Sequence, residues 1–119
     1  MIALLDETDK FHEEAISRVK RIREPRVPVM AISEVVWHMK KYGIPLTFLR
    51  DALRSPFSLV ESTGEDVEFA LSHPGLNELD YDDVDDLIIL SCTKRRGLCL
   101  CTFDLDLKKR AQSEEVPTC

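Results

Sequence analysis

Acidic side chains gather at the edges of apolar segments in this chain, most densely between Asp80 and Asp104. A carboxylate beside a buried element is costly unless it is paired or binds a cation, so this placement points to a ligand. Three acids from remote positions open or follow predicted elements: Glu34, Asp86 and Asp104. Hard oxygen ligands suit Mg²⁺ or Mn²⁺, and such a cation can activate water and neutralise charge on a phosphodiester. The residue types therefore predict a divalent-metal site.

A structural interpretation of the same acids must be weighed against this one. A carboxylate in the first turn of a helix interacts favourably with the helix dipole and needs no ligand. Most carboxylates of the dense acidic stretch are assigned to this role: Asp80, Asp82, Asp83 and Asp85. Asp86 and Asp104 are retained as the candidate metal ligands of the stretch.

The elements that must position these acids follow from apolar periodicity and from Gly and Pro punctuation. Helices are predicted over residues 11–23, 34–42, 45–53, 65–72, 82–96 and 105–112, and strands over 27–32, 57–60 and 98–102. Strands that alternate with helices predict an α/β fold, here a three-layer α/β/α sandwich with a mainly parallel central sheet. Ligands of such sheets bind where strands end, which is where Glu34 and Asp104 are expected.

The run Leu87–Leu90 is ambiguous, because its periodicity alone fits a strand as well as a helix. A helix is favoured by its length, by the acids in its first turn and by the basic residues in its last turn. Gly97 then follows the helix at the position where a left-handed residue commonly ends one.

Composition sets the broad class of the protein. With 119 residues, 44% hydrophobic and 32% charged, the chain predicts one domain over residues 1–119. No apolar run approaches the roughly 20 residues of a membrane helix, and no basic flank marks a signal peptide, which predicts a cytoplasmic protein without a membrane partner. The formal charge of −6 argues against indiscriminate binding to polyanions. Local basic clusters still permit RNA contact: Arg18–Arg23, Lys94–Arg96 and Lys108–Arg110.

Other residues that carry chemistry receive structural interpretations. The four cysteines lack a CxxC motif and regular disulfide spacing, which predicts reduced, mostly buried thiols. Packing or surface roles are expected for all three histidines: His12, His38 and His73. Trp37 and Met39 are expected to fill a core or a dimer seam.

The motifs around the acids resemble those of PIN domains. Tyr81–Leu107 has an Asp that opens an apolar helix, a Gly after a basic helix end, a strand, and a Thr-x-Asp motif before a leucine-bearing helix. Ile32–Met39 resembles the family's middle motif, in which a Glu leads an apolar helix. Residues 6–22 resemble the segment that follows the first strand in VapC-type toxins. The resemblance covers nearly the whole chain.

This resemblance implies roles for individual residues. Glu34, Asp86 and Asp104 match three of the family's four metal-site acids, and Asp106 matches an auxiliary acid of the last motif. Thr102 matches a small polar residue that steadies the site through hydrogen bonds. The implied cofactor is Mg²⁺ or Mn²⁺, and the implied partners are an RNA substrate, an antitoxin protein and a second copy of the chain.

The resemblance lacks the family's first acid, which ends a central first strand. Met1–Leu5 aligns instead with the helix that follows that strand, so the favoured interpretation is a chain that begins downstream of the usual start. The other interpretation makes Ile2–Leu5 a shortened first strand and Asp6 its acid. Two functions are therefore carried forward: a metal-dependent endoribonuclease of toxin type, and a catalytically impaired homologue that serves as a dimerisation or partner-binding module.

Overall fold

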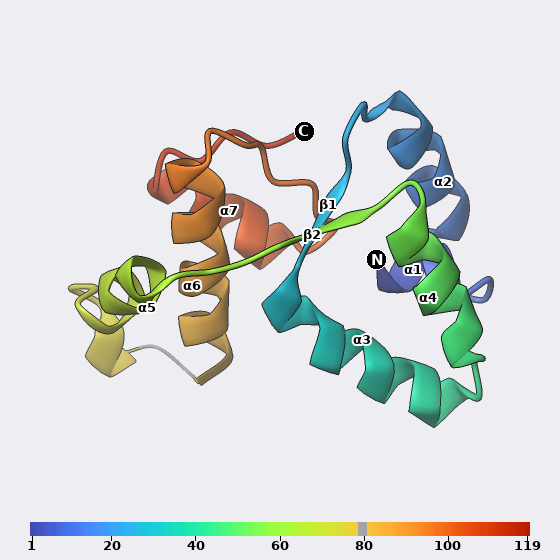
Figure 1. Ribbon diagram of the computed structural model, residues 1–119. Helices are drawn as coiled ribbons and strands as arrows, with labels where there is room; N and C mark the ends of the chain where they lie inside the picture. The colour runs from blue at the N-terminus through green and yellow to red at the C-terminus, as the bar shows by residue number, and fades with distance from the viewer. Residues whose placement is uncertain (79–80) are drawn as a thin grey trace. The chain divides into compact units, whose positions relative to one another are not determined.

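The computed structural model describes residues 1–78 and 81–119. It divides the chain into two compact units, Met1–Val60 and Glu61–Cys119, which are taken in turn (Figure 1). Within the described ranges no helix is long and apolar enough to cross a membrane.

The first unit is built from four helices and a two-stranded parallel sheet. Its elements are α1 (Ile2–Leu5), α2 (His12–Arg21), β1 (Arg26–Pro28), α3 (Val29–Tyr42), α4 (Leu46–Arg54) and β2 (Ser58–Val60). The strands pair in parallel, with Arg26 opposite Ser58 and Pro28 opposite Val60. Parallel strands need a crossover connection, and here α3 and α4 supply it.

Helices α3 and α4 pack against each other through their apolar residues. Gly43 ends α3 in the left-handed conformation, with φ of 65°, which glycine adopts at little steric cost. Pro45 caps α4, where its missing N–H costs nothing. Val35 and Met39 from α3 and Leu49 from α4 are then buried together. The predicted helices of this region are confirmed.

In its described residues, 61–78 and 81–119, the second unit holds three α-helices, a 3₁₀ turn and one isolated bridge. Its elements are α5 (Gly64–Leu71), η1 (Leu76–Glu78), α6 (Tyr81–Arg95) and α7 (Leu105–Ser113). Leu100 bridges to Thr118 in parallel. Leu90 of α6, Ala111 of α7 and Val116 form a core against which Leu100 and Leu107 pack. The helical interpretation of Leu87–Leu90 is confirmed, with Gly97 at φ of 65° after the helix.

The extended segments differ most from their prediction. The strand expected over 27–32 ends at Pro28, and α3 starts at Val29, so the predicted start of this helix at residue 34 is wrong. The short-strand interpretation of Ile2–Leu5 is also wrong, because this segment is helix α1. Residues 98–102 form one bridge instead of a strand buried on both faces. A strand needs neighbours for its backbone groups, and among the described residues only Thr118 supplies a bridge partner.

The prediction of four reduced thiols is wrong for two of them. Cys99 and Cys119 form a disulfide, while Cys92 is a buried free thiol and Cys101 an exposed one. The bridge closes a loop that contains α7 and the segments on either side of it. The spacing of the cysteines along the chain does not indicate this pairing. Trp37 does not fill the core, since 63% of it is exposed, so of its two expected roles only the dimer seam stays a prediction; its neighbour Met39 is buried as predicted.

Candidate metal site

Asp104 lies at the start of α7 and is fixed in place by its neighbours. Its Oδ1 accepts hydrogen bonds from the backbone N–H groups of Asp106 and Leu107, at 2.9 and 3.2 Å, and so caps the helix. The hydroxyl of Thr102 accepts a hydrogen bond from the Asp104 N–H at 3.1 Å. Among the described residues no donor bonds Oδ2 of Asp104, so one oxygen of an exposed, oriented carboxylate is left for a ligand.

Asp86 and its acidic neighbours on α6 have different environments. Asp83, in the first turn, accepts a hydrogen bond from Arg110 of α7 at 3.1 Å, which ties the two helices together. Asp86 lies one turn further along and is half-buried. Asp80 and the side chain of Asp82 lie outside the described residues, so their predicted capping role has no structural counterpart here.

Glu34 lies on α3 of the first unit, but not in its first turn as predicted. The helix begins at Val29, which places Glu34 in the second turn on the exposed side. Among the described residues its carboxylate has no hydrogen-bond or ion-pair partner. Glu34 therefore offers two unoccupied oxygens to a ligand.

The predicted convergence of these acids stays a prediction. Glu34 belongs to the unit Met1–Val60, whereas Asp86, Asp104 and Asp106 belong to the unit Glu61–Cys119. Across residues 1–78 and 81–119, no group of three His, Cys, Asp or Glu side chains is arranged to hold a metal ion. What the donors do show is suitable chemistry, since carboxylate oxygens are the ligands that Mg²⁺ and Mn²⁺ prefer.

The sequence interpretation missed a buried carboxylate, Asp66 of α5. Its side chain is fully buried and forms a two-pronged ion pair with Arg95, with distances of 3.1 and 2.8 Å. The Arg95 guanidinium holds the pKa of Asp66 well below its usual range, and Asp66 in turn raises the pKa of Arg95. The pattern Thr63-x-x-Asp66 is a capping box. The sequence could therefore have indicated the bonds between Asp66 and Thr63, but not the ion pair with Arg95.

The basic residues at the C-terminal end of α6 take part in structural contacts. Besides the Arg95 ion pair, Lys94 donates to the backbone carbonyl of Glu114 at 3.1 Å and Arg96 to that of Glu61 at 3.2 Å. This cluster therefore anchors the second unit, which agrees with its structural interpretation and leaves RNA contact to other basic residues.

Asp6, the substitute offered for the family's first acid, is engaged within the first unit. Its Oδ1 accepts from the Thr8 hydroxyl at 2.6 Å and from the Thr8 N–H at 3.0 Å. Nε2 of His38 lies 2.9 Å from Oδ2, and because a carboxylate only accepts, this nitrogen must carry the hydrogen. These bonds, with Thr8 first, lower the pKa of Asp6 from 3.8 to about 2. Asp6 therefore joins the α1–α2 turn to α3.

We expect Asp6 to stabilise the fold above pH 3.8 and to lose that contribution as the pH falls toward about 2. A folded-state pKa below the unfolded value means that the unfolded chain binds the proton first, so acid favours unfolding. Urea unfolding from neutral pH down to about pH 2 should show that Asp6→Asn lowers the free energy of unfolding at neutral pH and that its difference from the natural chain narrows in acid. The exposed neighbour Glu7 provides the control: Glu7→Gln should change neither the free energy of unfolding at neutral pH nor its dependence on pH. A constant difference across this range would contradict the assignment.

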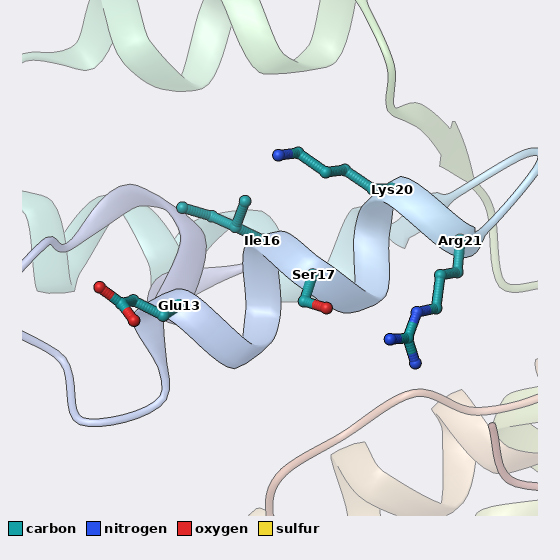
Figure 2. Close-up of a pocket in the computed structure, with 5 residues that line it drawn as sticks. All are labelled: Glu13, Ile16, Ser17, Lys20 and Arg21. Atoms are coloured by element: carbon teal, nitrogen blue, oxygen red, sulfur yellow. The ribbon is translucent and has the colours of Figure 1, made fainter.

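A shallow hollow on the surface of α2 is unrelated to these acids. It is lined by Glu13, Ile16, Ser17, Lys20 and Arg21. Figure 2 shows the Lys20 and Arg21 side chains pointing to different sides of the helix. Charges of both signs that do not converge on one point make a poor catalytic pocket, and none of the predicted site acids lines it.

Comparison with known protein families identifies the class of this protein. The family model for the PIN domain matches residues 1–112, so one model spans both units and the chain belongs to the PIN domain family. Comparison with curated proteins finds no match, and neither does comparison with solved structures.

Family membership settles the coarse features of the chain. PIN domains are α/β proteins of a nuclease superfamily and generally use divalent metal ions. The predicted family and α/β fold class are therefore confirmed, and the parallel pairing of β1 with β2 agrees with them.

Proposed function

We propose that this protein is a Mg²⁺- or Mn²⁺-dependent endoribonuclease that hydrolyses RNA phosphodiester bonds. The observation that carries the proposal is the PIN family match over residues 1–112. The motif acids lie within that range and are assigned by their resemblance to the family's motifs. Glu34, Asp86 and Asp104 are assigned as metal ligands, and Asp106 as an auxiliary acid. When bound, the metal ion supplies Lewis acidity and a hydroxide-like water nucleophile at neutral pH.

The chain's own contribution is clearest at Asp104, whose carboxylate is oriented by its neighbours. Thr102 and the α7 N-terminus fix Asp104, because the Thr102 hydroxyl bonds its N–H and its Oδ1 caps the helix. Asp83 is held by Arg110 of α7. Asp86, one turn further along α6, is assigned to the metal by its match to the family motif. A rigid helix end reduces the reorganisation that ligand binding would otherwise require.

We further propose the role of a cytoplasmic toxin controlled by an antitoxin protein. The support is the likeness of residues 6–22 to the corresponding segment of VapC-type toxins. In this role the chain forms a homodimer, and base choice depends on side chains around the site, because contacts to phosphate carry no sequence information.

Asparagine substitutions at the two α6 and α7 acids test the proposed activity. We expect Asp86→Asn and Asp104→Asn each to slow Mn²⁺-dependent cleavage of single-stranded RNA by about 10- to 100-fold, the range seen when metal sites are perturbed. Asparagine caps helices as well as aspartate does, so Asp104→Asn keeps the α7 cap while it removes the charge. The matched control is Asp85→Asn, an exposed acid beside Asp86, which should retain full activity.

The outcomes separate the candidate functions. RNA cleavage at an unchanged rate by both variants would contradict the assignment of Asp86 and Asp104 to the metal site. Absence of cleavage together with absence of Mn²⁺ binding in calorimetry would favour the catalytically impaired homologue, which binds a partner without hydrolysing RNA.

A further inference from the structure

The stretch Val35–Arg50 has a charge balance opposite to that of the whole chain. It contains Lys40, Lys41 and Arg50 and no Asp or Glu, in a protein with 22 acids and a formal charge of −6. Glu34 and Asp51 flank the stretch, and Arg50 is paired with Asp51 at 3.2 Å, so its local positive charge comes from the two lysines. The stretch covers the second half of α3 and the start of α4. Both lysines are exposed. The region is therefore locally positive and suited to a polyanion.

Two aromatic rings stand exposed in the same stretch. Trp37 is 63% exposed and Tyr42 is 56% exposed, whereas Val35 and Met39 on the same helix are buried in the core. Neighbouring aromatic rings that are exposed to solvent form an apolar patch, and such a patch commonly marks an interaction surface. The side of α3 that carries Trp37 therefore serves something other than the core of this unit.

Lys41 links the two rings into one surface. Its ammonium nitrogen lies 5.4 Å from the centre of the Trp37 ring and 5.5 Å from that of Tyr42. The Tyr42 ring is braced from behind by His38, whose ring centre is 4.5 Å away and which is itself held by Asp6. Trp37, Lys41 and Tyr42 thus form a preordered patch of two aromatic faces with a cation between them, here called the Trp37 patch.

We propose that the Trp37 patch binds single-stranded RNA, with bases stacked on Trp37 and Tyr42 and a phosphate beside Lys41. Aromatic faces interleaved with cations are how proteins hold single strands without sequence preference. The inference rests on the proposed function for the identity of its ligand and gives that function a place where the substrate strand is gripped.

A second copy of the chain fits the Trp37 patch less well. A two-fold dimer brings the same surface of both subunits together. If the patch lay on the two-fold axis, Lys40 and Lys41 would approach their own copies, and only the flanking acids Glu34 and Asp51 could offset their charge. RNA supplies both the planar apolar faces and the negative charge, so it matches the patch and a like-charged copy does not. The proposed dimer must use another surface.

The single tryptophan of the chain makes this inference directly measurable. We expect an oligouridylate of about 12 nucleotides, the scale of single-strand binding sites, to quench Trp37 fluorescence saturably in EDTA, where no metal-dependent cleavage occurs. Anisotropy of labelled RNA should show about tenfold weaker binding for Trp37→Ala, as expected for one lost base stack. Lys41→Gln should weaken binding and reduce the slope of log affinity against log salt by about 0.7.

Lys10→Gln is the matched control, because Lys10 also lies over a ring, with its nitrogen 5.0 Å from the centre of the Phe11 ring. It should change neither the affinity nor the slope. The proposal is overturned if RNA binds without altering Trp37 emission, if RNA fails to bind at low salt, or if Trp37→Ala dissociates a dimer in sedimentation velocity and leaves RNA affinity intact. Binding in EDTA without later cleavage in Mn²⁺ would reject the proposed nuclease activity while retaining this surface.

Discussion

Replacement of Asp66 by asparagine should lower the free energy of unfolding of the full chain by about 3 kcal/mol, the range for breaking a buried, hydrogen-bonded charge pair. Asp66 is fully buried, and its oxygens accept hydrogen bonds from Arg95, Ser91 and Thr63. An amide of the same shape has only one acceptor oxygen. Its NH₂ group cannot accept a hydrogen bond and would face the donors that bond one of the two Asp66 oxygens. At least two hydrogen bonds would therefore be lost without any change in the volume of the side chain.

The neighbouring acid Glu65 provides a matched control for this change. It is exposed in the same turn of α5, so Glu65→Gln makes the same chemical substitution without breaking a buried bond and should cost less than about 0.5 kcal/mol. In a double-mutant cycle with Arg95→Gln, the cost of Asp66→Asn should shrink, because its main partner is already gone. Equal costs for Asp66→Asn and Glu65→Gln in urea unfolding would refute the role assigned to the pair.

The ion pair also predicts a pH dependence with a definite sign. The pKa of Asp66 is held below its usual value by Arg95, so its contribution is complete above pH 3.8 and is lost as acid protonates the folded state. Asp66→Asn should therefore cost most near neutral pH and progressively less in acid.

Opening the Cys99–Cys119 disulfide should lower the free energy of unfolding by about 3 kcal/mol, the loop-entropy estimate for a closed loop of this size. The two cysteines are 20 residues apart. The bridge joins the chain's last residue to the segment that leads into Thr102 and Asp104. Backbone bonds of 2.8 Å from Leu100 to Pro117 and 2.9 Å from Cys119 to Leu100 follow the same path. Without the bridge the C-terminal segment retains these bonds and the burial of Val116.

Urea unfolding of the natural chain and of Cys119→Ser, with and without dithiothreitol, measures this contribution. The two proteins should differ without reductant and coincide with it, since reductant removes the only feature that distinguishes them. Cys101→Ser is the control, because Cys101 is an exposed free thiol two positions from Cys99 and should behave as the natural chain does. Alkylation of the denatured, unreduced protein should label two thiols, Cys92 and Cys101; labelling of all four would contradict the bridge.

The sequence by itself determined the helices and the candidate acids of this PIN domain. Helix signals are local: apolar residues recur every three to four positions, Gly43 and Gly97 supply the left-handed ends, and Asp104 caps the helix that follows it. The family motifs are equally local, so they identify Glu34, Asp86 and Asp104 as candidates without reference to the fold. The assignment of these acids to one metal site remains a prediction.

Tertiary structure alone decided the features that join remote positions. Asp66 and Arg95 lie 29 residues apart, and no local pattern pairs them. The segment 98–102 has the composition of a buried strand but forms one bridge, because strand formation depends on neighbours that its own residues do not specify. Trp37 and Met39 are both apolar and lie on one helix, yet only packing against Leu49 shows that Met39 is core and Trp37 is surface. Local chemistry therefore indicates which residues are candidates for a site, whereas long-range packing decides which side chains are buried in structural contacts.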